Sequence, residues 1–153
     1  MKVRTAAIAM SAVAAAAVIA GCGDTAGDEQ TLSYTEGKGE FSPIGGASER
    51  VTPPGGGFVL SIPLEDDSGS SAGELNGICV ATQESSAQEP LTGTCSATAD
   101  LPDGQLALNV GGKIGEDVTG SIVGGTGDYE GATGTFESSG GNRSTDTFKF
   151  TLP

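Results

Sequence analysis

The stretch from Gly124 to Phe136, GGTGDYEGATGTF, decides the fold of this chain. Five of its thirteen residues are glycine, and β-forming residues flank it, Ser121-Ile122-Val123 before it and Thr135-Phe136 at its end. Glycine adopts positive φ and permits close approach of the backbone, so a strand that runs into such a cluster reverses in a tight turn. The stretch therefore predicts a β-hairpin, with one strand ending at Val123 and the next beginning at Ala132.

Eight segments have the composition and spacing of short β-strands. Near the C-terminus, Phe148, Phe150 and Leu152 alternate with polar residues, and this period of two is typical of a strand with one buried face. Eight such strands joined by tight turns predict an all-β domain, either an up-and-down barrel or a sandwich. The expected strands are 31–35, 57–63, 77–82, 91–98, 105–111, 117–123, 132–138 and 146–152.

The N-terminus has the layout of a secretory signal. Lys2 and Arg4 precede an apolar run, Ala6 to Ala20, that is shorter than the ~20 residues of a membrane-spanning helix. The run ends Ile19-Ala20-Gly21-Cys22, which is typical of a bacterial lipobox, since small residues fit a signal peptidase and the thiol accepts a diacylglycerol. An ordinary secretory signal followed by an unrelated cysteine is the alternative.

This signal predicts three parts of the chain: a lipoprotein signal peptide at 1–21, an acylated cysteine with a flexible tether at 22–30, and a β-barrel domain at 31–153. Acyl chains anchor a protein to a bilayer without spanning it. We therefore expect the acylated Cys22 to hold the mature protein on the lipid bilayer of the cell membrane, at its extracytoplasmic face.

Lipidation of Cys22 would leave Cys79 and Cys95 as an even pair of cysteines. An exported protein meets an oxidising environment, so we expect these two residues to form a disulfide. The bridge would close a loop of about 16 residues and contribute ~3 kcal/mol in the chain-entropy model. Two buried free thiols are the alternative, and the absence of a C-x-x-C spacing argues against a redox role.

The charges and the missing residue types exclude several functions. The whole chain carries a net charge of −13 and no histidine, and such an acidic surface repels nucleic acid. Without histidine, Ser-His-Asp and Cys-His catalysis and histidine-ligated metal sites are impossible. Any acid–base chemistry would rest on carboxylates, Tyr34, Tyr129 or lysine. The acidic segment Glu65-Asp66-Asp67 lacks the spacing of an EF-hand, so we expect neither a metal site nor a cofactor.

The glycine-rich stretch, read with Ile122, fits the pattern I-x-G-G-[ST]-G-x-[YF]-x-G-A-x-G. It resembles the hairpin shared by plant dirigent proteins, allene oxide cyclases and bacterial relatives of their barrel. Between about Phe58 and Leu152 the order of short motifs is similar to exported actinobacterial members of this group. The resemblance implies a calycin-like, eight-stranded antiparallel up-and-down β-barrel. It also implies a homotrimer and an interior that takes apolar molecules.

The resemblance assigns no catalytic residue, because the chain has Val59 and Glu65 where the cyclases have proline and tyrosine. The cyclases' glutamate falls near Thr35 or Glu36, and Tyr129 is expected to cover the barrel end or a subunit contact rather than to take part in chemistry. We therefore expect a barrel that binds a small apolar or aromatic ligand, or a protein partner, without catalysis. An isomerase or cyclase acting on a lipid-derived or aromatic substrate is the alternative, and a buried carboxylate with a raised pKa would favour it. A packed barrel used as a surface scaffold is a third interpretation.

Overall fold

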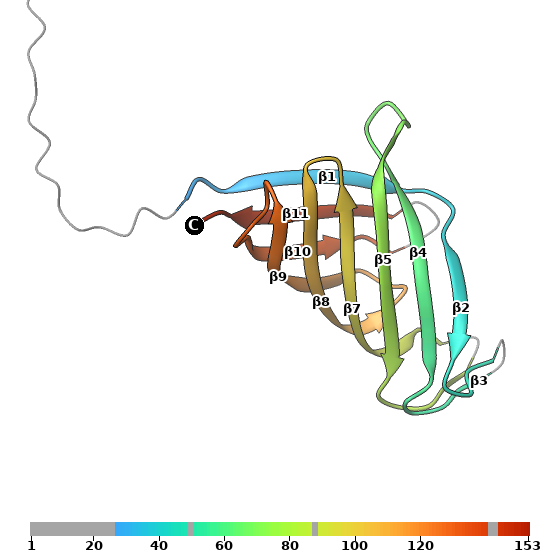
Figure 1. Cartoon of the computed structure of the whole chain (residues 1–153). Coiled ribbons are helices and arrows are strands. Elements are labelled where there is room, and N and C mark those ends of the chain that lie inside the picture. The colour runs from blue at the N-terminus through green and yellow to red at the C-terminus, as the bar shows by residue number, and fades with distance from the viewer. Residues whose placement is uncertain (1–26, 49–50, 87–88, 141–143) are drawn as a thin grey trace, which may run out of the picture.

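Long antiparallel strands follow one another around a closed sheet in the computed structural model, which describes residues 27–48, 51–86, 89–140 and 144–153 (Figure 1). The predicted lipidation site, Cys22, lies outside these residues, as does the expected signal peptide. The strands in chain order are β1 (Gln30–Glu36), β2 (Glu40–Ile44), β3 (Val51–Thr52), β4 (Gly57–Glu65), β5 (Ser71–Ala81), β6 (Ser85–Ser86), β7 (Leu91–Leu101), β8 (Gly104–Ile114), β9 (Val118–Gly127), β10 (Thr133–Ser138) and β11 (Thr145–Thr151).

Pairing of β1 with both β11 and β4 closes the sheet. The order is β1-β11-β10-β9-β8-β7-β5-β4, and the end of β1 then pairs with the end of β4 at Thr35–Glu65 and Glu36–Leu64. Every pairing in the series is antiparallel. The fold is therefore an all-β, closed eight-stranded antiparallel barrel, which confirms the predicted barrel and selects it over the sandwich.

The two-residue period of the strands fills the interior of this barrel. In β11, Asp146, Phe148 and Phe150 are buried while the residues between them reach the surface. The same alternation buries Leu60, Ile62 and Leu64 in β4. A closed sheet leaves one face of every strand inside, so alternate residues of all eight strands meet in a single core. The largest fully buried side chains are Phe148, Phe150, Leu64, Leu106, Leu108, Asp146 and Cys79.

The glycine-rich stretch forms the expected hairpin, but its turn lies four residues later than predicted. Strand β9 continues through Gly124 and Gly125 to Gly127 and pairs there with β8. Its pairing register shifts opposite Ala107 and Leu108, which is a β-bulge. The chain reverses after Gly127, whose φ is +63°. The prediction that Val123 ends the strand was wrong, because a bulged strand accommodates glycines that otherwise indicate a turn.

Three short strands were not predicted. β2 follows β1 in the chain and pairs with residues 57–61 of β4. β3 pairs with β6 in a small separate sheet. Pro43 lies within β2, and proline normally argues against a strand because it donates no hydrogen bond. β2 tolerates it because it is the last strand of the sheet order. On the side of β2 that has no neighbouring strand, the missing N–H of proline costs no hydrogen bond between strands.

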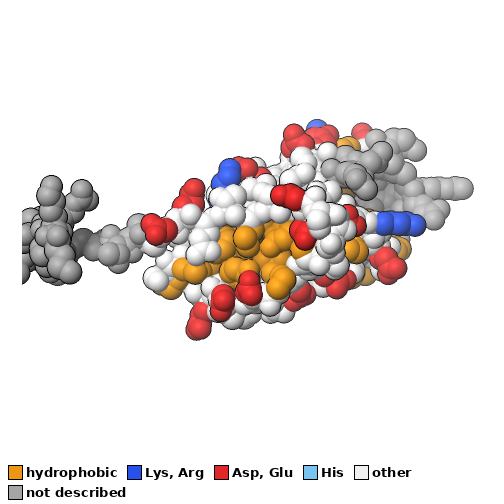
Figure 2. Space-filling view, turned by 90° about the horizontal axis from the view of Figure 1, so that it is seen from above, with side chains coloured by type: hydrophobic (Ala, Val, Ile, Leu, Met, Phe, Trp, Pro, Cys, Tyr) orange, Lys and Arg blue, Asp and Glu red, His pale blue; other side chains and the backbone are white. Residues whose placement is uncertain are grey.

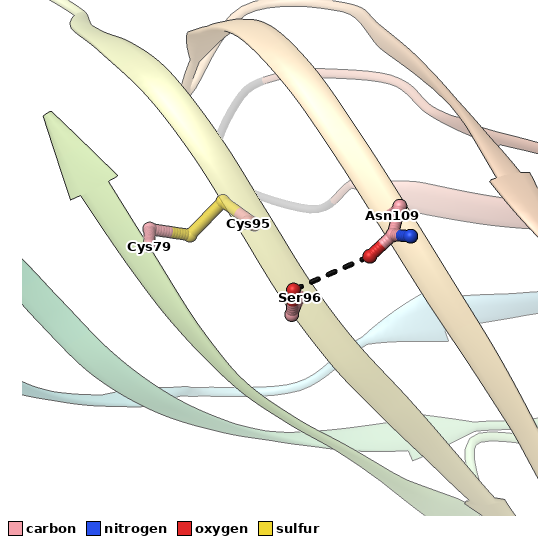
Figure 3. Close-up of a disulfide and its surroundings, with 4 residues drawn as sticks. All are labelled: Cys79, Cys95, Ser96 and Asn109. Carbon is pink, nitrogen blue, oxygen red and sulfur yellow. Dashed lines mark hydrogen bonds between the residues drawn. A yellow bond between two sulfur atoms is a disulfide. The ribbon is translucent and has the colours of Figure 1, made fainter. Parts of the chain in front are cut away.

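The predicted disulfide between Cys79 and Cys95 is confirmed. These cysteines are directly paired residues of β5 and β7, with their Cα atoms 4.0 Å apart, and both are buried (Figure 3). On the opposite face of β7, Ser96 donates a hydrogen bond of 3.2 Å to Asn109 of β8. The disulfide therefore belongs to the inner face of the barrel wall.

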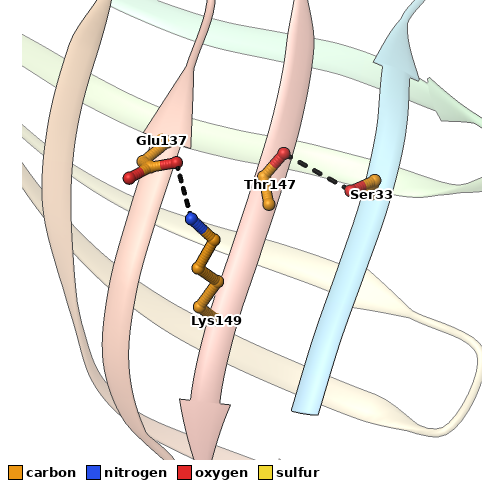
Figure 4. Close-up of polar contacts among 4 residues, drawn as sticks. All are labelled: Ser33, Glu137, Thr147 and Lys149. Atoms are coloured by element: carbon orange, nitrogen blue, oxygen red, sulfur yellow. Dashed lines mark hydrogen bonds and ion pairs between the residues drawn. The ribbon is translucent and has the colours of Figure 1, made fainter. Parts of the chain in front are cut away.

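The outer surface of the barrel carries polar pairs between strands. Lys149 of β11 contacts Glu137 of β10 at 3.1 Å, and Thr147 of β11 lies 3.3 Å from Ser33 of β1 (Figure 4). These contacts are exposed, so each contributes at most about 1 kcal/mol. They fix no interior side chain. In the described part of the chain, no helix is long and apolar enough to cross a membrane.

Candidate functional site

A cavity of about 270 Å³ lies inside one end of the barrel. We call this end the cavity end; it is formed by β2, by the segment Gly115–Asp117 between β8 and β9, and by the residues that follow β10. Most of the cavity wall is apolar, because it is built from the inward faces of β4, β5, β7, β8 and β10. The apolar side chains of the wall are Phe41, Phe58, Leu60, Ile62, Leu75, Cys79, Cys95, Val110, Ile114, Val118 and Phe136.

Two aromatic rings stand at the opening of the cavity. Phe41 of β2 packs edge-on against Phe58 of β4, with ring centroids 5.5 Å apart. Phe41 is 57% exposed, although it also lines the cavity. A large apolar ring that remains exposed beside a cavity is placed to contact whatever enters, so β2 forms one lip of the opening.

The disulfide stiffens the part of the wall next to Phe58, which is the direct pairing partner of Cys79. Cys79 and Cys95 both line the cavity, and the bridge joins adjacent strands at the same height. Rigid elements hold a site more accurately than loops do. The disulfide therefore fixes β5 and β7 in the wall beside β4 and the lip at β2.

Polar groups gather on the side of the cavity where β1, β10 and β11 meet. Glu36, Ser138 and Ser144 line it there. The backbone N–H of Glu36 donates a hydrogen bond of 2.8 Å to the carbonyl of Ser144, which fixes the end of β1 against the start of β11. Glu36 thus adds a carboxyl to a wall that is mostly apolar.

A second carboxyl, that of Asp146, is buried directly behind this polar group. Asp146 pairs with Tyr34 of β1 and with Ser138 of β10, so the three residues form one row across the inner face. Its side chain has no exposure to solvent, and neither carboxylate oxygen has a hydrogen-bond partner among the described residues. A buried polar group without a partner is uncommon and costly, which makes Asp146 the most unusual interior residue of the described chain.

Burial raises the pKa of Asp146 from 3.8 to about 7. Loss of hydration is the main cause, and the negative charge of Glu36 raises the pKa further, while the hydroxyl of Ser138 partly opposes the change. Asp146 is therefore a carboxyl that keeps its proton at pH values where an exposed aspartate has lost it. Two neighbouring carboxyls in different environments can hold and pass a proton, which is the arrangement of many acid–base sites.

The opposite end of the barrel, formed by the turns between β4 and β5, β7 and β8, and β9 and β10, has a more open depression of its own. We call it the hairpin end. Figure 2 shows hydrophobic side chains gathered in an elongated hollow there, with acidic side chains along its edges. Gln30, Leu32, Asp103, Asp128, Tyr129 and Leu152 line a depression at this end.

Tyr129 closes the hairpin end. It is 7% exposed and packs edge-on against Phe150, with ring centroids 5.6 Å apart. Burial raises the pKa of Tyr129, and Tyr34, Asp103 and Asp128 raise it further. The burial of Tyr129 fits the expected role as a cover for the barrel end, and Tyr129 is not among the residues that line the cavity.

The structure brings together one residue that the sequence singled out and one that it did not. Glu36 lines the cavity, close to the position that the resemblance indicated for a glutamate. Asp146 was missed, although the period of two in β11 places it on the same face as Phe148 and Phe150. The described residues contain no group of three or more histidine, cysteine, aspartate or glutamate side chains that could hold a metal ion.

A closed eight-stranded antiparallel barrel of this form resembles the barrel of dirigent proteins. Pyocyanin demethylase has a TM-score of 0.61 and 20% identity, covering 80% of this chain and 99% of that chain. The pterocarpan synthase dirigent proteins GePTS1 and PsPTS1 have TM-scores of 0.60 and 0.57 and identities of 16% and 19%. They cover 86% and 84% of this chain, and 94% and 99% of their own. At these identities the likeness concerns the fold alone.

The other two comparisons found nothing. No family model matches the chain, and no curated protein matches it. The function of the chain is therefore inferred from the residues of the cavity.

Proposed function

We propose that this chain is a lipid-anchored, extracytoplasmic barrel protein that binds a small apolar molecule in the cavity at one end of the barrel. The cavity carries this proposal: most of its wall is apolar, and its volume of about 270 Å³ is close to the lower limit of ligand pockets. A cavity of this size suits a ligand of one or two rings. The apolar lip at Phe41 and Phe58 supports entry of such a molecule from solvent.

Native mass spectrometry of the protein purified from its own membrane tests the proposal. We expect a reproducible added mass of a few hundred daltons on the folded protein. Two matched variants locate the ligand: Val110→Phe fills the cavity, whereas Val59→Phe places the same group on the outer face of β4. We expect the added mass to disappear in the first and persist in the second. Bare wild-type protein, with no uptake from a lipid extract of its host, would refute binding.

The carboxyl pair supports a second candidate function, an isomerase or cyclase acting inside the barrel. Glu36 lines the cavity and Asp146 lies buried behind it with a raised pKa. In this proposal Glu36 exchanges a proton with the bound molecule, and Asp146 is a positioning residue that holds the proton for Glu36 when no ligand is present. A proton that is given up at one atom and taken back at another rearranges a molecule without changing its mass.

An exchange experiment separates the two candidates. Ligand recovered after incubation of the protein in D₂O is compared with ligand that met the Glu36→Gln and Asp146→Asn variants. Catalysis predicts an isomer that carries deuterium on carbon with wild-type protein, and much slower labelling with either variant. Recovery of the unchanged, unlabelled ligand from wild-type protein would leave binding alone.

The anchor belongs to the proposal as well. Its support is the lipobox that ends at Cys22 and the apolar run before it. An anchored barrel would meet apolar molecules at the membrane surface, where they concentrate. Native mass spectrometry also counts the subunits of the cleaved domain, which tests the homotrimer expected from the resemblance.

A further inference from the structure

The charged side chains that line the cavity have a single sign. They are Glu36 and Glu116, and Asp146 adds a third carboxyl behind Glu36. No lysine or arginine is among the described residues of the wall. Lys113 contacts Glu116 at 3.9 Å, and both side chains are more than half exposed, so this cation lies at the surface outside the cavity.

We infer that the ligand of this cavity is a small, mostly apolar cation, an amine or a nitrogen heteroaromatic ring, whose positive nitrogen lies against the carboxyl of Glu36, with the carboxyl of Asp146 behind it. This inference rests on the proposed binding function and names the class of its ligand. Glu36 lines the cavity, where its carboxyl can pair with a positively charged N–H group, and the buried carboxyl of Asp146, which has no hydrogen-bond partner among the described residues, adds negative charge behind it when ionised. An anionic ligand would instead add a negative charge to a dry site that already holds carboxyls.

The apolar wall fits the remainder of such a molecule. Phe41, Phe58 and Phe136 line the cavity, and aromatic side chains pack edge-to-face or offset against a further ring. Ring and charge therefore have separate places: the ring lies against the phenylalanines and the aliphatic wall, and the nitrogen lies at the carboxyls. This separation favours a flat ligand with its charge at one end.

Ionisation of Asp146 would control the affinity for this ligand. The groups that face it are Tyr34 and Glu36 from β1 and Ser138 from β10, and Glu116 lies farther along the cavity wall. None of these supplies a positive charge. With the pKa of Asp146 raised to about 7, a cation that prefers the ionised carboxyl binds about tenfold more tightly at pH 8 than at pH 6. Its binding also releases a proton.

A matched series of three probes tests the inference. Naphthylmethylamine, naphthylmethanol and naphthoate share one ring system and differ in charge, and titration calorimetry with the full-length protein measures the affinity for each. We expect the amine to bind at least tenfold more tightly than the alcohol, and the naphthoate to bind most weakly. Equal or tighter binding of the alcohol or the naphthoate would overturn the charge inference and leave the binding function standing. If no probe binds, the binding function fails and the inference fails with it.

Variants assign the preference to the carboxyl pair. Glu36→Gln and Asp146→Asn should each remove most of the preference for the amine while the alcohol still binds, which also shows that the variant is folded. Glu137→Gln, which neutralises an exposed acid on the outer face of β10, should keep the preference. Arg143 lies outside the described residues, and the Arg143→Gln variant tests its charge. A preference for the amine that appears only in this variant would overturn the inference for the native chain.

Discussion

Replacing Asp146 with asparagine should make the barrel more stable at pH 8 and remove most of the pH dependence of its stability. The native carboxyl keeps its proton up to about pH 7, whereas in the unfolded chain it loses the proton near 3.8. Between these values the folded state binds more protons than the unfolded state. Stability is therefore greatest at low pH and falls as the pH rises through 7.

The magnitude follows from the two pKa values. The difference between 3.8 and about 7 corresponds to about 4 kcal/mol, at about 1.4 kcal/mol per pKa unit. Water that enters the cavity beside Glu36 would reduce this, so we expect the wild-type protein to lose ~2 to ~4 kcal/mol between pH 4 and pH 8. Asparagine has nearly the same shape as aspartate and no charge. The unfolding free energy of the Asp146→Asn variant should therefore change little with pH from this site.

Urea denaturation at several pH values, with the disulfide intact, measures the effect. The other groups with displaced pKa values titrate outside this range: the pKa of the exposed Asp66 is lowered by hydrogen bonds from Ser68 and Ser70, and the pKa values of Tyr34 and Tyr129 are raised above 10. Asp67→Asn, in an exposed loop, is the matched control and should behave as the wild type. Wild-type stability that is flat from pH 5 to pH 8 would refute the view that Asp146 is buried without a partner.

Three further predictions concern the wall, the hairpin and the anchor. Replacing Cys79 and Cys95 together with alanine should lower the unfolding free energy by ~3 kcal/mol, since the bridge closes a loop of 16 residues; a loss below 1 kcal/mol in urea denaturation would contradict this. Gly125→Ala should cost ~1 to ~3 kcal/mol, because its new methyl would meet the carbonyl of Tyr129, whereas Gly124→Ala has open space and should lie within ~0.5 kcal/mol of the wild type. Cys22→Ser should abolish labelling with a radioactive fatty acid and release the protein from the membrane fraction, and retention of the label would exclude this lipidation site.

The regular part of the fold follows from the sequence because the barrel repeats one rule. Alternating apolar residues indicate a strand, and the residues between strands indicate turns, so each of the eight barrel strands was expected within a few residues of its place. Errors arise where pairing overrides local preference. The glycines from Gly124 to Gly127 favour a turn locally, yet residues 104–107 of β8 pair with them and the strand continues. Pairing with β4 likewise makes a strand of β2 despite Pro43.

The site was harder to predict than the fold. Asp146 is the first residue of the expected strand 146–152, and charged side chains are seldom fully buried. The buried face that holds Phe148 and Phe150 was therefore not extended to Asp146. Glu36 and Asp146 are also far apart in the chain, and only the register of β1 against β11 makes them neighbours. A sequence pattern records which face a residue occupies along its own strand. It does not record which residue of another strand lies beside it.

The position of the carboxyl pair follows from the way in which the barrel closes. The N–H of Glu36 donates to Ser144, before the start of β11, whereas the N–H of the next residue, Gly37, donates to Pro63 of β4. Within two residues the chain therefore changes its hydrogen-bonding partner from the segment before β11 to β4. Glu36 lies at this change of partner, and its side chain faces inward. Asp146 comes two residues after Ser144, on β11. Tyr34 of β1 and Ser138 of β10 pair with it on either side. The closure of the sheet thus places the carboxyl of Glu36 at the edge of the cavity and buries that of Asp146, and this burial raises the pKa of Asp146.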